Sequence, residues 1–183
     1  MTPPDLIPFT AFGGDWARYE NELYNVFINE IARGGLTFRD ARVTCRRSPE
    51  TAGRWAAFWH LVQEGRVEDD RTPDLRRCER IRWVRWMIEN APSHDEIDEW
   101  QNTRGTVVNT LLWYREEYLV VLAQRQDHWL LLTAYCTEKS GRIRQLRKER
   151  DAFRRVNLPY ALKRLKPPKL ARAASNAPPT HGR

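Results

Sequence analysis

Apolar residues recur at helical spacing near the start of the chain. Between positions 15 and 33 they fall three or four residues apart, and Gly-Gly pairs stand before and after the stretch: Trp16, Tyr19, Leu23, Val26, Phe27 and Ile31. This spacing places apolar side chains on one face of a helix. We therefore expect an amphipathic helix over residues 15–33 that packs on a sheet.

Strand-like segments dominate the region from residue 107 to residue 136. Residues 107–114, 118–124 and 128–136 are apolar and rich in β-branched or aromatic side chains, and short charged links join them. Links this short connect neighbouring antiparallel strands, so the pattern predicts a β-meander. Alternate residues of a strand share a face. We assign one set of the last strand to the core, namely Leu130, Leu132, Ala134 and Cys136, and the other set to an open face: Trp129, Leu131, Thr133 and Tyr135.

The remaining segments give weaker patterns. Residues 41–46 read as a short strand, residues 55–63 as either helix or strand, and residues 64–74 as a charged exposed loop. In residues 81–86 apolar side chains alternate with arginine, and a helical turn is expected over residues 87–91. Residues 95–100 read as an acidic helical turn, and residues 142–155 as a basic surface helix.

These elements predict an α+β fold. N-terminal helices would pack on an antiparallel meander of about four strands, followed by a basic C-terminal helix. We expect a helical region over residues 1–50 that packs on the core, and a core domain over residues 51–160. The basic, Pro-rich tail over residues 161–183 is expected to be disordered.

The net charge of the chain bears on the kind of partner that it could bind. The 183 residues carry a formal charge of +7, mostly from arginine, whose planar fork suits phosphate. The positive net charge could serve to bind a polyanionic partner, or it could only keep the protein soluble. No apolar stretch reaches the roughly 18 residues of a membrane span, and the start of the chain lacks a signal-peptide pattern. We therefore expect a cytoplasmic protein without membrane contacts.

Three cysteines, Cys45, Cys78 and Cys136, are far apart in the sequence. An odd number without a Cys-x-x-Cys pair argues against a disulfide framework and against a zinc or redox motif. Phosphate-binding loops, His-Glu-x-x-His and Gly-x-Ser-x-Gly motifs are also absent from the sequence. We expect reduced, structural cysteines, no metal site and no cofactor.

His60 is the one histidine inside an apolar run. Imidazole, with an unperturbed pKa of about 6.5, can accept and return protons near neutral pH, which makes it a natural general base for a ribose hydroxyl. The alternative is a hydrogen-bonded core histidine without a chemical role. The choice depends on what lies around the ring in the fold.

Arginines cluster in the segment after the charged loop. Guanidinium stays protonated, so its chemical roles here are to bind phosphate and to stabilise charge that develops on it. We predict Arg77 and Arg80 for the catalytic site. Substrate binding is predicted for three others: Arg76, Arg82 and Arg104. The alternative for each is a solvated, ion-paired surface position.

Thr133 and Tyr135 could contact a phosphate oxygen and orient or stack on a base of single-stranded RNA. The same residues are also common in strands for reasons of β-propensity alone. Together with His60 and the arginines they make the set that a metal-free ribonuclease needs.

The order of these motifs resembles a known family. His60, Arg77-Cys78-Glu79-Arg80-Ile81, Arg104, a hairpin ending in Leu132-Thr133-Ala134-Tyr135 and a basic helix are similar to phage-associated nucleases of the barnase/EndoU/colicin/RelE-like superfamily. The similarity covers roughly residues 55–155. It implies helices on a four-stranded antiparallel sheet whose concave face carries the active site, RNA cleavage without metal, and often a toxin role.

In EndoU-like toxins the site consists of a histidine, a basic residue and a Thr-x-Tyr strand. The matching positions are His60, one of Arg77 or Arg80, Thr133 and Tyr135. EndoU enzymes of the larger type use a second histidine, for which this sequence has no equivalent, so the general acid stays unassigned. RNA, either tRNA or mRNA, and a cognate immunity or antitoxin protein are the implied partners.

Our hypothesis from the sequence is an endoribonuclease in which His60 deprotonates a ribose 2′-hydroxyl, giving a 2′,3′-cyclic phosphate. Two alternatives use the same residues differently. One is a noncatalytic nucleic-acid-binding regulator or antitoxin with the same basic face, and the other is an assembly protein whose arginines contact acidic protein partners. Cleavage of RNA without metal distinguishes the first hypothesis from both.

Overall fold

The computed structural model describes residues 2–65 and 72–164, which form a mixed α+β fold around a curled sheet. Six strands make this sheet, in the order β1-β2-β8-β7-β6-β5. Their bounds are β1 Thr37–Phe38, β2 Ala41–Cys45, β5 Ile97–Arg104, β6 Val107–Tyr114, β7 Tyr118–Gln124 and β8 Trp129–Cys136. All neighbours pair antiparallel except β2, which runs parallel to β8. The predicted meander is confirmed as β6, β7 and β8.

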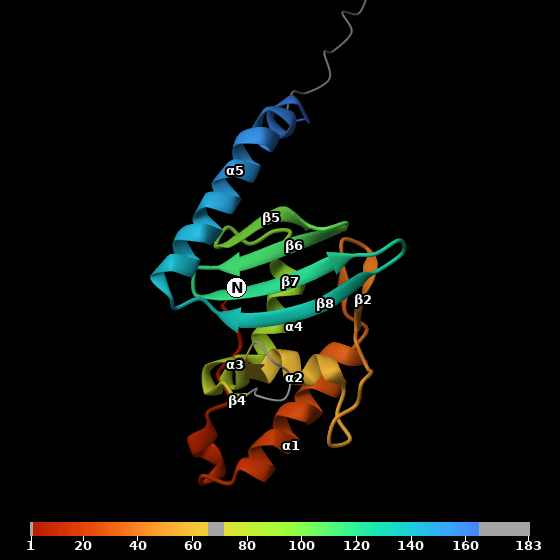
Figure 1. Ribbon diagram of the computed structural model, residues 1–183, viewed down its shortest axis with the longest axis vertical. Coiled ribbons are helices and arrows are strands. Elements are labelled where there is room, and N and C mark those ends of the chain that lie inside the picture. The colour runs from red at the N-terminus through yellow and green to blue at the C-terminus, as the bar shows by residue number, and fades with distance from the viewer. Residues whose placement is uncertain (1, 66–71, 165–183) are drawn as a thin grey trace, which may run out of the picture.

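Helices lie on both faces of the sheet, but the two faces carry different numbers of them (Figure 1). One face carries most of them, together with the larger core. Their bounds are η1 Phe9–Phe12, α1 Trp16–Val26, the π-helical η2 Phe27–Ala32, α2 Ala56–Val62, α3 Leu75–Glu79 and α4 Ile81–Asn90. The other face carries only one described helix, α5 Ser140–Arg164, over a smaller core. A short ribbon of β3 Gln63–Glu64 and β4 Thr72–Pro73 lies apart from the main sheet.

Helix α1 begins directly after Asp15, which is its N-cap residue. The Asp15 side chain accepts a hydrogen bond from the backbone N–H of Arg18 at 3.0 Å, which satisfies one of the free donors of the first turn. Tyr19, Leu23 and Val26 then face the core. The expected amphipathic helix over residues 15–33 is confirmed, with its last part wound as the π-helical segment η2.

Three sequence expectations need correction or completion. Residues 55–63, left open between helix and strand, form α2. Residues 81–90 are one helix, which begins at Ile81 and not at residue 87, because the apolar residues at 81, 84 and 88 share a buried face. Residues 95–100 are not a helical turn, since residues from Ile97 onward pair with β6 as β5. The expected tail lies mostly outside the described residues.

A β-bulge in β8 reverses the predicted faces of its first half. The register shifts between Val121 and Leu122 of β7, so that Val121 pairs with Thr133 while Leu122 pairs with Leu131, and Leu132 is the extra residue. Trp129, Leu131 and Ala134 therefore all belong to the larger core. The assignment of Leu130 and Leu132 to the core was wrong, and both are half-buried beside the open face.

The smaller core holds α5 on the sheet. Trp100 of β5 and Trp113 of β6 meet edge to face at 5.8 Å, and Leu146 of α5 packs with them at 0% exposure. Ion pairs surround this contact, with Arg150 Nη1 lying 2.5 Å from an Asp98 oxygen. The helix expected as a surface element thus has one buried side, and its docking leaves part of the sheet face uncovered.

Replacement of Leu146 by alanine is expected to lower the free energy of unfolding by about 2–5 kcal/mol, since it opens a cavity between two tryptophans. Val156→Ala on the same helix is the control, because Val156 is 77% exposed and should change stability by about 0.5 kcal/mol or less. Urea unfolding followed by tryptophan fluorescence measures both. Equal midpoints for the two variants would contradict the packing role of α5.

Candidate nucleic-acid interface

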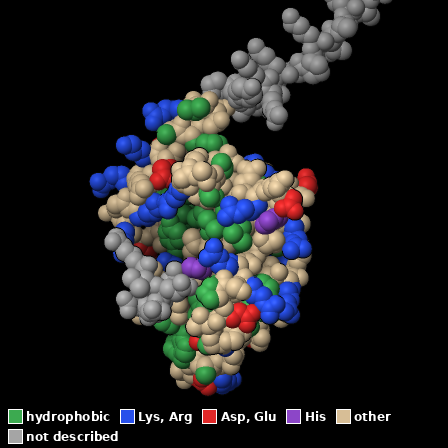
Figure 2. Space-filling view, turned by 45° about the vertical axis from the view of Figure 1, so that its right-hand side comes forward, with side chains coloured by type: hydrophobic (Ala, Val, Ile, Leu, Met, Phe, Trp, Pro, Cys, Tyr) green, Lys and Arg blue, Asp and Glu red, His purple; other side chains and the backbone are tan. Residues whose placement is uncertain are grey.

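The uncovered part of the sheet face is hollowed. A space of about 150 Å³ opens beside α5, and we call it the sheet hollow. Its floor is apolar and its rim is polar; its lining is Leu111, Val121, Leu132, Asn102, Asn109, Thr133, Tyr135, Arg104 and Arg142. Figure 2 shows hydrophobic side chains gathered in the middle of one face with Lys and Arg side chains around them.

A second space of about 180 Å³, the His60 hollow, lies between α2 and β8. Arg46, Ala57, His60 and the residues of β8 from Leu130 to Leu132 line it. Leu132, the extra residue of the bulge, lines both spaces. Leu132 therefore borders both hollows, and we call the two hollows together the open face.

His60 lies in the last turn of α2 and is half-buried. It is not enclosed in the larger core, whose members from the same helix are Ala57, Phe58, Leu61 and Val62. This position places the imidazole at the edge of the open face. His60 is therefore not a fully buried core histidine, and its catalytic role stays a prediction.

Thr133 holds His60 in this place. Its hydroxyl donates a hydrogen bond to the backbone carbonyl of His60 at 3.1 Å, which joins β8 to the end of α2. A hydroxyl has one hydrogen, so Thr133 keeps only acceptor capacity for other groups. In this structure Thr133 therefore acts as a positioning residue, and its expected contact with phosphate stays untested.

Tyr135 is surrounded by two arginines. Its hydroxyl oxygen accepts hydrogen bonds from Arg142 Nε at 3.1 Å and Nη2 at 2.7 Å. The Arg77 guanidinium lies 5.5 Å from the ring centroid and that of Arg142 lies 5.9 Å from it. Arg142 retains further N–H groups after these contacts, because guanidinium has five. It is the cation best placed to bind an anion beside Tyr135.

The Arg77 guanidinium is already hydrogen-bonded to residues near it. Its Nε donates to Asp74 at 2.9 Å and its Nη1 to the Gln63 carbonyl at 2.7 Å, which ties α3 to the β3 segment. Arg77 and Tyr135 both line a further space of about 490 Å³, and Arg77 does not line the sheet hollow. Its predicted phosphate role would compete with these bonds.

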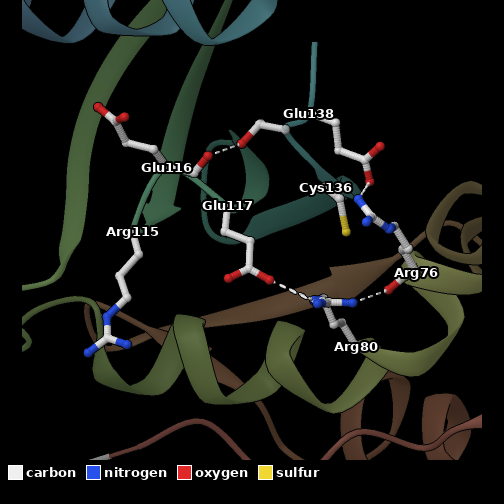
Figure 3. A pocket seen from close by; sticks show the side chains of 8 residues that line it. Arg76, Arg80, Arg115, Glu116, Glu117, Cys136 and Glu138 are labelled. Carbon is white, nitrogen blue, oxygen red and sulfur yellow. Dashed lines mark hydrogen bonds and ion pairs between the residues drawn. The ribbon is translucent and has the colours of Figure 1, made fainter. Parts of the chain in front are cut away.

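Arg76 and Arg80 line a different pocket of about 470 Å³, drawn in Figure 3. Arg80 pairs with Glu117 at 2.8 Å and Arg76 pairs with Glu138. Three arginines and three glutamates line this pocket, so their charges cancel: Arg76, Arg80, Arg115, Glu116, Glu117 and Glu138. Such a pocket offers little net attraction for phosphate.

The last two predicted binding arginines lie far apart. Arg82 of α4 donates to Glu30 at 3.2 Å on the helical side of the molecule, away from the open face. Arg104, the last residue of β5, is exposed and lines the sheet hollow. The structure therefore brings Arg104 together with Thr133 and Tyr135, and it does not bring Arg82 to them.

Charge distinguishes the open face from the pocket of Figure 3. Its lining includes Arg46, Arg104, Arg142 and His60, and no carboxylate belongs to either hollow among the described residues. The pocket of Figure 3 contains equal numbers of arginines and glutamates. Unopposed cations around an apolar floor are what a single-stranded polyanion with planar bases needs.

The cysteines are free, in agreement with the sequence expectation. Burial raises the pKa of Cys45 and of Cys78 to about 12, and that of Cys136 to about 11. Thiols of this kind are poor nucleophiles at neutral pH. Within the described ranges no three His, Cys, Asp or Glu side chains gather as metal ligands would, and no helix is long and apolar enough to span a bilayer.

Sequence reasoning missed four residues of the open face: Arg46, Asn102, Asn109 and Arg142. Arg142 was expected only as part of a charged helix, although it follows Tyr135 by seven residues, close enough for a sharp turn to return it to the strand. Asn102 and Asn109 pair across the β5–β6 hairpin, so both amides fall on one face. Two asparagines in strands, where asparagine is uncommon, were the available indication.

Comparisons with known proteins give no independent guide to these residues. A scan against protein-family models, a search of curated proteins and a search of solved structures each found no significant match.

Proposed function

We propose that this protein is a metal-independent endoribonuclease of the barnase/EndoU/colicin/RelE-like type, and that the open face is its active site. The observation that carries the proposal is that two hollows sharing Leu132 are lined by His60 from α2, by Thr133 and Tyr135 from β8, and by Arg104 and Arg142, while no carboxylate among the described residues lines either hollow. The sheet hollow beside α5 supports the proposal, because the resemblance implies an active site on one face of the sheet.

In the proposed reaction His60 accepts the proton of a ribose 2′-hydroxyl. The 2′-oxygen then forms a bond to the adjacent phosphorus, and the bond from phosphorus to the 5′-oxygen breaks. The products are a 2′,3′-cyclic phosphate and a 5′-hydroxyl, whose proton would come from the Tyr135 phenol. Arg142 has N–H groups left to stabilise the negative charge on the phosphorane.

The cation roles differ from those predicted from the sequence. Arg77 and Arg80 are held by Asp74 and Glu117 respectively, so we assign phosphate binding first to Arg142 and Arg104. The same engagement of Arg77 and Arg80 favours the alternative function, a noncatalytic RNA-binding regulator or antitoxin that uses only the basic face. Both functions predict binding that weakens steeply as salt rises.

The experiment that separates the two is cleavage of a single-stranded RNA in EDTA. The nuclease is expected to release fragments that end in a 2′,3′-cyclic phosphate and to leave the DNA of the same sequence intact, because DNA lacks the attacking hydroxyl. Binding of both oligonucleotides without cleavage would establish the regulator instead. Cleavage that stops when EDTA is added would reject the metal-free mechanism.

A toxin role adds a cellular expectation to the proposal. Expression should arrest growth of the host, and His60→Ala should relieve the arrest at equal protein level. A cognate immunity or antitoxin protein would then cover the open face. Arrest that persists in the His60 variant would separate toxicity from the proposed cleavage.

A further inference from the structure

Asn109, which lines the sheet hollow, has a buried side-chain oxygen without a hydrogen-bond partner among the described residues. The residue lies on β6 and is only 4% exposed. Buried polar atoms are nearly always paired, since leaving one unpaired costs free energy. An unpaired oxygen on a residue that lines a pocket indicates a group that a ligand satisfies.

The direction of the neighbouring hydrogen bonds fixes which atom is unpaired. Gln145 and Asn102 both donate to the Glu149 carboxylate at 3.0 Å, and a carboxylate only accepts. Asn102 therefore turns its oxygen toward Asn109, which donates to it at 3.4 Å. The Asn109 amide must direct its N–H₂ group to Asn102, so its oxygen is the atom without a partner among the described residues. A ligand here has to donate a hydrogen bond.

The other residues that line the sheet hollow indicate the shape and the charge of a ligand that would fit it. Leu111, Val121 and Leu132 form an apolar floor, and Arg104 and Arg142 stand at its rim. At about 150 Å³ it is smaller than the roughly 300–1,000 Å³ of drug-sized pockets, so it holds a single ring system. A planar ring with an N–H donor, joined to an anion at the rim, is a nucleotide.

Resting on the proposed function, we infer that the sheet hollow binds one unpaired base next to the scissile phosphate, and that Asn109 selects a base with an exocyclic amino group. Adenine, cytosine and guanine each carry such a group, which is free to donate in an unpaired base. Uracil has only a ring N–H between two carbonyl oxygens, and either oxygen would face the Asn109 oxygen unfavourably. Uridine should therefore be the disfavoured nucleotide at this position.

The test measures binding, so that it does not depend on catalysis. Fluorescence anisotropy with 2′-O-methyl oligomers of adenosine, cytidine or uridine is expected to give a preference of about 10-fold or more for adenosine or cytidine over uridine, the size of one good base contact. Asn109→Leu should reduce this preference below about 3-fold. Its unfolding midpoint should stay equal or rise, because a buried amide whose oxygen is unpaired, and whose N–H₂ makes only a long 3.4 Å bond, is replaced by an apolar side chain of similar size.

Gln101→Leu is the matched control. It removes an amide from the neighbouring strand, where Gln101 donates to Thr110 at 3.5 Å on the opposite face of the sheet, and it should leave the base preference unchanged. Uridine binding as tight as that of the other oligomers, or a preference unaffected by Asn109→Leu, overturns the inference while the proposed function stands. Absence of binding to all three oligomers would instead reject the proposed function.

Discussion

His60→Ala is expected to lower kcat/KM for RNA cleavage by about 10²–10⁴, the usual contribution of a positioned general base. The effect should fall on kcat, because the imidazole acts on the proton that moves in the transition state. RNA binding should change little, since the cations of the open face, Arg104 and Arg142, remain. Quench experiments in EDTA, with anisotropy measured on the same protein, give both quantities.

His128→Ala is the control for this prediction. His128 pairs with Asp127 at 2.6 Å at the turn before β8, so its removal takes away an imidazole without touching the two hollows. Wild-type cleavage is expected. If His60→Ala kept the wild-type rate, or if both variants lost activity equally, His60 would not be the base.

Arg142→Gln is expected to lower kcat by about 10²–10³, the cost of removing a donor to developing negative charge. Glutamine also cannot reproduce the two bonds from Nε and Nη2 to the Tyr135 oxygen. Arg142→Lys should recover only part of the rate, because a lysine is a point charge without the planar fork. The rate of a single turnover under saturating enzyme measures this effect.

Arg144→Gln supplies the matched change in formal charge. Arg144 is exposed on the same helix and lines neither hollow, so its replacement should alter kcat less than about 3-fold, apart from weak screening effects on binding. Equal losses in both variants would show that net charge matters and the position of Arg142 does not. Urea midpoints of the two proteins exclude a stability explanation.

Local patterns predicted much of the fold. The spacing from Trp16 to Ile31 specified the first helix, and the three apolar runs after Val107 specified the meander. The errors in secondary structure came from segments whose apolar spacing fits both a helix and a strand. Ile97 and Trp100 are three residues apart, which fits a helical turn, yet pairing with β6 makes the segment a strand. Tertiary pairing of this kind leaves no mark in the segment itself.

The site was harder to predict from the sequence, because it depends on how the strands align with one another. Alternation along β8 assigned Leu132 to the core, but the bulge inserts one residue and changes the phase of the side chains before Thr133. The pairing of Tyr135 with Arg142 requires the turn between β8 and α5, and the unpaired oxygen of Asn109 requires the hairpin register. Residue types were visible in the sequence, and their neighbours were not.

Ion pairing explains why most of the arginine cluster was misleading. From Arg76 to Arg82 every predicted phosphate ligand has a carboxylate partner: Glu138, Asp74, Glu117 or Glu30. Glu138, Glu117 and Glu30 come from distant parts of the chain, whereas Asp74 lies only three residues before Arg77. The sequence alone therefore did not show most of these ion pairs. Within the described part of the chain, Arg46, Arg104 and Arg142 line the two hollows, and neither hollow includes a carboxylate.

The most direct test of the open face as the RNA site is a crystal structure with a 2′-deoxy dinucleotide, which the proposed reaction cannot cleave. The account predicts that its phosphate contacts Arg142, with the preceding sugar beside His60 and a base on the Leu132 floor. A dinucleotide bound instead in the arginine and glutamate pocket of Figure 3, or on the helical side near Arg82, would contradict it.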